Sequence, residues 1–135
     1  MARDHRRLRV YHEAHSLAIA IYRETRDSPR DEWFGIRSQV RRAAISTVSN
    51  LVEGNARRTI GEYVSFLNVS RASAAEVSYL VQLASELGYL SAPAYQELAR
   101  ACDQLIPQLE RLVQRMESLQ RSGPRDQRPR PKTKD

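Results

Sequence analysis

The chain has 135 residues, enough for one domain, and its single cysteine excludes an intrachain disulfide. Hydrophobic residues make up 41% of the chain and aromatic residues 7%, with only five glycines, a balance that favours helix over sheet. No apolar run approaches the roughly 20 residues that a membrane span needs, and no signal-peptide pattern is recognisable. We therefore expect a cytoplasmic protein that does not contact membranes.

The net charge of +6 is concentrated at the two ends of the chain. Residues 1–9 hold four arginines and one aspartate, and residues 121–135 hold six basic side chains and two aspartates. Basic ends attract polyanions without specifying which one. Arginines outnumber lysines twenty to two, which suits bidentate phosphate contacts, although a GC-rich genome produces the same bias.

Residues 8–27 form the first predicted helix, because apolar side chains recur at spacings of three and four: Leu8, Tyr11, Ala14, Ala18, Ile21 and Tyr22. Ser28-Pro29 ends it. Residues 31–53 form the second helix, with Gly54 as its predicted C-terminal cap. Its inward stripe comprises Trp33, Ile36, Val40, Ala43, Thr47 and Leu51.

Residues 60–87 form the third predicted helix, since Thr59 and Glu62 match a capping box and Gly88 can end the helix. Its stripe runs through Tyr63, Phe66, Leu67, Ser70, Ala74, Val77, Val81, Ala84 and Leu87. Residues 92–120 form the fourth helix, in which Tyr95, Leu98, Cys102, Leu105, Leu109, Leu112, Met116 and Leu119 form a heptad seam. Additional apolar columns come from Ala99, Ile106 and Val113.

Short connections between four long amphipathic helices predict an all-α, antiparallel up-down four-helix bundle over residues 8–121. A basic arm, residues 1–7, precedes it, and an Arg/Pro/Lys-rich tail, residues 122–135, is expected to be disordered. The broad apolar face of the fourth helix and the apolar third helix exceed what one small bundle should cover. We therefore expect self-association.

Several motifs together carry a family resemblance. They are Leu8-Arg9-Val10-Tyr11, the run from Gly35 to Ser46, Asn50-Leu51-Val52-Glu53-Gly54, Arg57-Arg58, and the run from Glu62 to Leu67. The chain resembles the four-helix-bundle proteins encoded in intervening sequences of bacterial large-subunit (23S) rRNA genes. The resemblance implies an up-down four-helix bundle that assembles into a barrel-like homopentamer, and it does not imply an enzyme. A related branch resembles the accessory protein of diversity-generating retroelements, a basic pentamer that binds a reverse transcriptase and structured RNA.

Clustered arginines are the candidate nucleic-acid-binding residues: Arg37, Arg41 and Arg42 in the second helix, Arg57 and Arg58 before the third, and Arg6, Arg7 and Arg9 at the start. Guanidinium groups suit phosphate contacts. The alternative is that these arginines form ion pairs within the bundle, for example with Glu53. We expect a non-catalytic protein that binds nucleic acid, with RNA preferred over DNA. The alternative is a scaffold that docks a protein such as a reverse transcriptase.

No catalytic site or cofactor is expected, because no Ser/His/Asp set, metal cluster or glycine-rich phosphate loop is recognisable. Asn50 and Glu53 lie one turn apart and are interpreted as structural. His12 and His15 have a spacing that can hold a metal, and His15 is expected to face inward. The Glu-x-x-His pairs typical of di-iron bundles are missing, so no metal is predicted.

Overall fold

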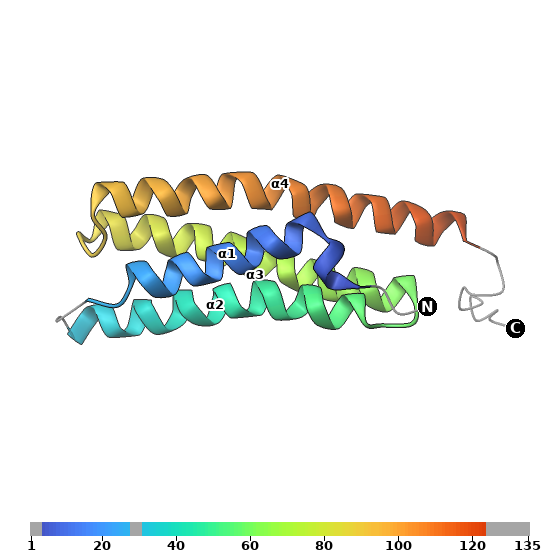
Figure 1. The fold of residues 1–135 in the computed structure, drawn as a ribbon, viewed down its shortest axis with the longest axis horizontal. Helices are drawn as coiled ribbons and strands as arrows, with labels where there is room; N and C mark the ends of the chain where they lie inside the picture. The colour runs from blue at the N-terminus through green and yellow to red at the C-terminus, as the bar shows by residue number, and fades with distance from the viewer. Residues whose placement is uncertain (1–3, 28–30, 124–135) are drawn as a thin grey trace, which may run out of the picture.

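Four helices pack antiparallel as a bundle in the computed structural model, which describes residues 4–27 and 31–123 (Figure 1). The helices are α1 (Arg9–Glu24), α2 (Asp31–Asn55), α3 (Ile60–Glu86) and α4 (Ala92–Ser122), and a 3-10 turn, η1 (His5–Arg7), precedes them. The predicted all-α bundle is confirmed. Most of the tail for which disorder is expected, residues 124–135, lies outside the described residues.

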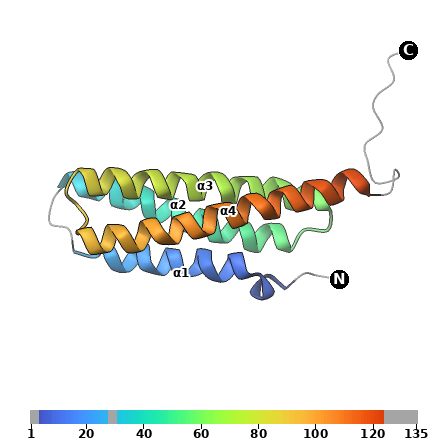
Figure 2. The ribbon, with the colours of Figure 1, turned by 90° about the horizontal axis from the view of Figure 1, so that it is seen from above.

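The chain order of the helices sets their neighbours. Helix α2 packs on α3, α3 packs on α4, and α1 lies against both α2 and α4 (Figure 2). The core between them contains most of the predicted stripes of α2 and α4, with Val40, Leu51, Leu98, Leu105 and Leu109 at 0–2% exposure. Within residues 4–27 and 31–123, no helix has the length and apolarity to cross a bilayer.

Helix α1 is rotated relative to its predicted stripe. The buried side chains are Val10, Ala14, Leu17, Ala20 and Ile21, whereas Tyr22 is 38% exposed. The prediction that Tyr22 belongs to the core is therefore wrong. A tyrosine satisfies a three-and-four spacing pattern, but its hydroxyl needs a hydrogen-bond partner, and at the surface water provides one.

The two ends of α3 and the start of α4 follow the predicted signals, whereas the ends of α1 and α2 do not. Helix α1 ends at Glu24, before the predicted bound at residue 27, and the predicted stop signal Ser28-Pro29 lies outside the described residues. Thr59 and Ser91 cap α3 and α4, their side chains accepting hydrogen bonds from the amides of Glu62 and Ala94. Gly88 follows α3 with a φ of +78°. Gly54 is not a C-terminal cap, because α2 continues through it to Asn55. A Cβ atom on Gly54 would lie 2.7 Å from Cβ of Phe66, so this glycine allows α2 and α3 to approach closely.

Exposed apolar side chains lie mainly on α1, α2 and α3 rather than on α4. The apolar columns of α4 are shared between α3 and α1, and its exposed large apolar side chain is Leu119, 46% exposed near the helix end. The expectation that α4 contributes a surplus apolar face is therefore wrong, whereas α3, the other helix of that expectation, does expose Val69 and Tyr79. Besides Leu119, the exposed large apolar side chains are Ile19, Tyr22, Phe34, Ile45, Val69, Tyr79 and Leu87.

Candidate nucleic-acid interface

Three of the predicted arginines meet two aromatic rings where the end of α1 faces the first half of α2. They line a shallow hollow of about 450 Å³, which we call the arginine–aromatic pocket. Its lining is Tyr22, Phe34, Arg37, Ser38, Arg41, Arg42 and Ile45. The α2 residues recur at helical spacing and lie beside the buried Val40 and Ala43, so they form a stripe on the outer side of the helix.

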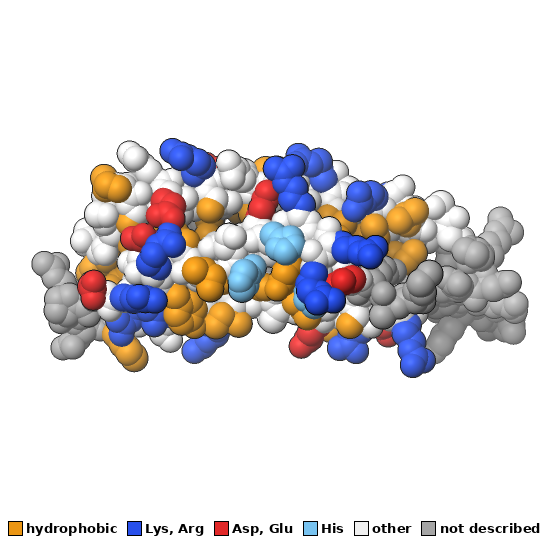
Figure 3. Space-filling view, in the orientation of Figure 1, with side chains coloured by type: hydrophobic (Ala, Val, Ile, Leu, Met, Phe, Trp, Pro, Cys, Tyr) orange, Lys and Arg blue, Asp and Glu red, His pale blue; other side chains and the backbone are white. Residues whose placement is uncertain are grey.

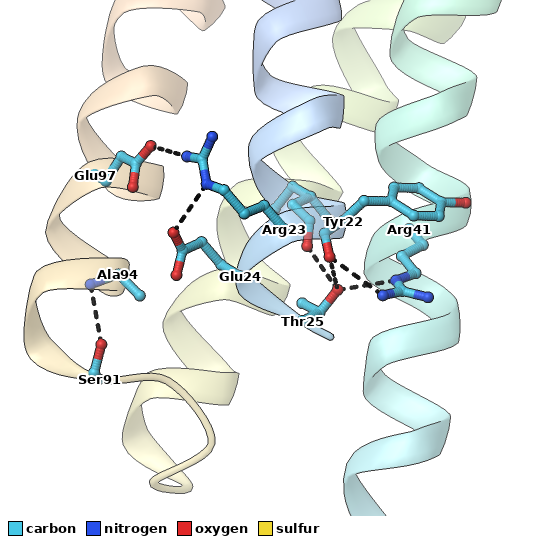
Figure 4. Close-up of polar contacts among 9 residues, drawn as sticks. Tyr22, Arg23, Glu24, Thr25, Arg41, Ser91, Ala94 and Glu97 are labelled. Atoms are coloured by element: carbon cyan, nitrogen blue, oxygen red, sulfur yellow. Dashed lines mark hydrogen bonds and ion pairs between the residues drawn. The ribbon is translucent and has the colours of Figure 1, made fainter. Parts of the chain in front are cut away.

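Arg41 is held in place by α1. Its Nε donates a hydrogen bond to Oγ1 of Thr25 at 2.9 Å, and its Nη2 donates to the carbonyl of Tyr22 at 3.3 Å (Figure 4). Its guanidinium carbon lies 4.4 Å from the centroid of the Tyr22 ring. Thr25 is itself fixed, because its hydroxyl donates to the carbonyl of Ile21 at 2.6 Å. Arginine has five N–H donors, so Arg41 keeps donors available for a ligand.

The other two arginines of the pocket are less constrained. The guanidinium carbon of Arg37 lies 5.3 Å from the centroid of the Phe34 ring, and Phe34 is 63% exposed. Arg42 is exposed. Among the described residues, no carboxylate lies within ion-pair distance of Arg37, Arg41 or Arg42. The alternative that these arginines are neutralised within the bundle is therefore not supported by the described part of the chain.

Arg23 shows the contrasting case on the same face. It pairs with Glu24 and with Glu97 of α4 (Figure 4). The hydrogen bond to Glu24, followed by the charge of Glu97, raises the pKa of Arg23. This arginine is therefore engaged in joining α1 to α4, whereas the arginines of the pocket form no ion pair with a described residue.

The N-terminal arginines lie at the opposite end of α1. Arg6 pairs with Asp4, and its hydrogen bond lowers the pKa of that carboxyl, while Arg9 pairs with Glu13 at 3.1 Å. Arg6 and Arg7 line a groove of about 600 Å³ between α1 and α4 that also contains the acidic Glu13 and Glu97. These arginines are therefore partly neutralised, in contrast to those of the arginine–aromatic pocket.

Sequence reasoning missed two arginines on α4. Arg111 and Arg115 line a groove of about 560 Å³ together with Arg9, Leu8 and other residues of α1 and α4. Their spacing of four places them on one helix face, but only the packing of α4 on α1 brings them to Arg9. On the face drawn in Figure 3, basic side chains lie on either side of the histidines.

The structure does not bring Arg57 and Arg58 to the arginine–aromatic pocket. They follow the far end of α2 at Asn55, which lies about 20 Å along the helix axis from Arg42. The guanidinium carbon of Arg57 lies 4.7 Å from the centroid of the Phe66 ring, and Arg58 is exposed. The fold therefore does not combine the arginines of the pocket with Arg57 and Arg58 into one phosphate-binding surface.

Asn50 and Glu53 do not form a joint site. The side-chain amide of Asn50 donates to the Ser46 carbonyl at 2.8 Å and to the Ser46 hydroxyl at 3.1 Å. That hydroxyl lies 2.7 Å from the hydroxyl of Ser73, which links α2 to α3. Glu53 is exposed and makes no ion pair with a described residue.

The two histidines of α1 are both exposed, so the expectation that His15 faces inward is wrong. The rotation of α1 that exposes Tyr22 exposes His15 as well. The His15 ring stacks on Tyr11 with centroids 5.9 Å apart, and Nε2 of His12 lies 2.6 Å from the Arg6 carbonyl. In the part of the chain that the structure describes, no three His, Cys, Asp or Glu side chains gather as metal ligands would.

Comparisons with known proteins place the chain among relatives. The family model described as "23S rRNA-intervening sequence protein" matches residues 6–111. A crystal structure of a protein of unknown function from the S23 ribosomal protein family of Bacteroides thetaiotaomicron superposes with a TM-score of 0.65. It is 16% identical, and the match covers 77% of this chain and 97% of that chain. A search of curated proteins finds no match. Because the family match spans most of the bundle, the chain belongs to the 23S rRNA-intervening sequence protein family.

Proposed function

We propose that the protein is a non-catalytic nucleic-acid-binding protein that binds structured RNA through the arginine–aromatic pocket, with further contacts from the arginines at the start of α1. The observation that carries the proposal is that Arg37, Arg41 and Arg42 lie together without an ion-pair partner among the described residues. An unpaired guanidinium releases a counterion from RNA when it contacts a phosphate, whereas a paired one must first leave its carboxylate.

Salt dependence tests this proposal. A fluorescently labelled RNA hairpin is titrated at several salt concentrations with the intact protein and with the double variant Arg37→Gln/Arg42→Gln. The logarithm of the binding constant should fall linearly as the logarithm of the salt concentration rises. The steepness of this fall should be smaller in the variant, by about 0.7–0.9 for each phosphate that the variant no longer neutralises. Arg23→Gln is the matched control, because it removes an exposed arginine that is already paired.

Two results would contradict RNA binding through this pocket. One is the absence of binding at low salt. The other is that the double variant and the Arg23→Gln control change the salt slope by the same amount. A DNA hairpin of the same sequence measures the preference for RNA, since the 2′-hydroxyl is the group by which a protein distinguishes the two.

Self-association is part of the proposal. The exposed Val69 and Tyr79 of α3 supply apolar surface for contacts between copies, and the resemblance of the chain implies a homopentamer. A ring of copies would repeat the pocket and thereby raise the local concentration of guanidinium groups. Light scattering should give five times the chain mass of 15.5 kDa. A mass of one chain at micromolar concentration would contradict this part.

The same apolar side chains favour a second candidate function, a scaffold that docks another protein. Val69 is 48% exposed and Tyr79 is 61% exposed, both on α3. If the protein is such a scaffold, it should retain a purified reverse transcriptase after nuclease treatment. Tyr79→Asp should release it, and retention that depends on RNA would reject the scaffold.

A further inference from the structure

We propose that the arginine–aromatic pocket holds an unpaired nucleotide, with its base stacked on the Phe34 ring and its phosphate bound by Arg42. The protein would therefore prefer single-stranded or looped RNA over continuous duplex. This inference rests on the proposed function, because it names the form of RNA that the same pocket selects.

The position of Phe34 is the first support. Its ring is 63% exposed, while the adjacent Trp33 is 1% exposed and lies 5.0 Å from the Tyr89 ring, centroid to centroid. The anchored Trp33 fixes the direction of this helix turn, so the exposure of Phe34 follows from helix geometry. An aromatic ring that is held in water beside basic side chains is the platform on which nucleic-acid bases stack.

The arrangement around the ring is the second support. Arg37 lies over Phe34, and Arg41 is fixed over Tyr22 by its hydrogen bonds to α1. The pocket thus alternates flat guanidinium groups with aromatic rings, and both kinds of group stack on bases. Its volume of about 450 Å³ lies in the range of small-ligand sites.

The pocket would bind base-paired nucleotides less tightly than unpaired ones. In an RNA duplex each base is already stacked between its neighbours, and the deep, narrow major groove does not admit side chains. A ring on a helix surface can therefore reach only bases that are unstacked. The phosphates of a duplex remain accessible to Arg42, so duplex binding is weakened rather than abolished.

The experiment compares two RNA probes in fluorescence anisotropy: an unstructured 12-nucleotide strand and a 12-base-pair duplex. Phe34→Leu keeps an apolar side chain but removes the flat ring, and Phe34→Trp keeps a ring. Leu119→Ala is the matched control, because Leu119 is an exposed apolar side chain of α4, 46% exposed, that is absent from the pocket lining.

The intact protein should bind the strand more tightly than the duplex, although the duplex carries more charge. Phe34→Leu should weaken strand binding by about 5- to 150-fold, the usual effect of removing one base stack, and should leave duplex binding and the salt slope unchanged. Phe34→Trp should retain strand binding, and Leu119→Ala should behave like the intact protein.

Three outcomes would overturn the inference. They are equal affinity for strand and duplex, Phe34→Leu binding the strand as tightly as the intact protein, and Phe34→Leu changing the mass in light scattering, which would assign the ring to a contact between protein copies. The failure of RNA binding as a whole is distinguishable, because it would appear as loss of binding to both probes by the intact protein.

Discussion

Gly54→Ala should destabilise the bundle, because the added methyl group has no space between α2 and α3. The new Cβ would lie 2.7 Å from Cβ of Phe66 and 3.3 Å from Cδ2 of Tyr63. The Cβ of Phe66 is attached directly to the backbone of α3, so rotation of a side chain cannot relieve the contact. Overpacking of this kind costs about 1–3 kcal/mol, while alanine in place of glycine in a helix gains about 1 kcal/mol. We expect a net loss of up to about 2 kcal/mol.

Gly35→Ala is the matched control in the same helix. A Cβ atom at Gly35 meets nothing within 4 Å, so this variant should gain about 0.5–1 kcal/mol from helix propensity alone. Thermal unfolding followed by circular dichroism, at one protein concentration, should place the Tm of Gly54→Ala below that of the intact protein and the Tm of Gly35→Ala above it. Equal Tm values for the two variants would refute the close approach of α2 and α3.

Three further predictions concern the core and the helix ends. Leu105 is fully buried, so Leu105→Glu should cost several kcal/mol and abolish the helical circular dichroism signal at 37 °C; a folded variant would show that this face contacts water. Thr59→Ala removes the N-cap of α3 and should cost about 1 kcal/mol in urea unfolding, with no loss expected from Ser65→Ala, since Ser65 is exposed within the helix. Burial raises the pKa of the Cys102 thiol from 9.0 to about 12. Between these pH values the folded state keeps the thiol proton while the unfolded chain loses it, so the free energy of unfolding should fall as pH rises from about 9 to about 12. Iodoacetamide should label Cys102 only in denaturant, and labelling of the native protein at pH 8 would contradict this.

The long helices were predictable because their periodicity is strong. The seam of α4 continues for many turns, and its central members Leu98, Cys102, Leu105 and Leu109 are all buried. The N-cap at Thr59 was also predictable, since its hydrogen bond is local in sequence. Gly54 was interpreted as a C-terminal cap because glycine is common just after the end of a helix. That interpretation is wrong, and only the packing of α3 on α2 shows that Gly54 serves a close contact between the two helices.

The candidate site was only half predictable. The spacing of Arg37 and Arg41 placed them on one face of a helix, but the sequence could not show which carboxylates would come near. Tyr22 satisfies the apolar pattern of α1, which predicts a core position, although it lies at the surface beneath Arg41. Phe34 does not belong to the predicted stripe, and its role depends on arginines from its own helix and on the end of α1.

The central claim, that RNA contacts the arginine–aromatic pocket, is tested most directly by arginine footprinting. The protein is treated with a dicarbonyl reagent that modifies accessible guanidinium groups, with and without the RNA hairpin, and modification is measured at each arginine by peptide mass spectrometry. RNA should protect Arg37 and Arg42, and should leave Arg71, which is exposed on α3, as reactive as before. Unchanged modification of Arg37 and Arg42 in the presence of saturating RNA would contradict the account.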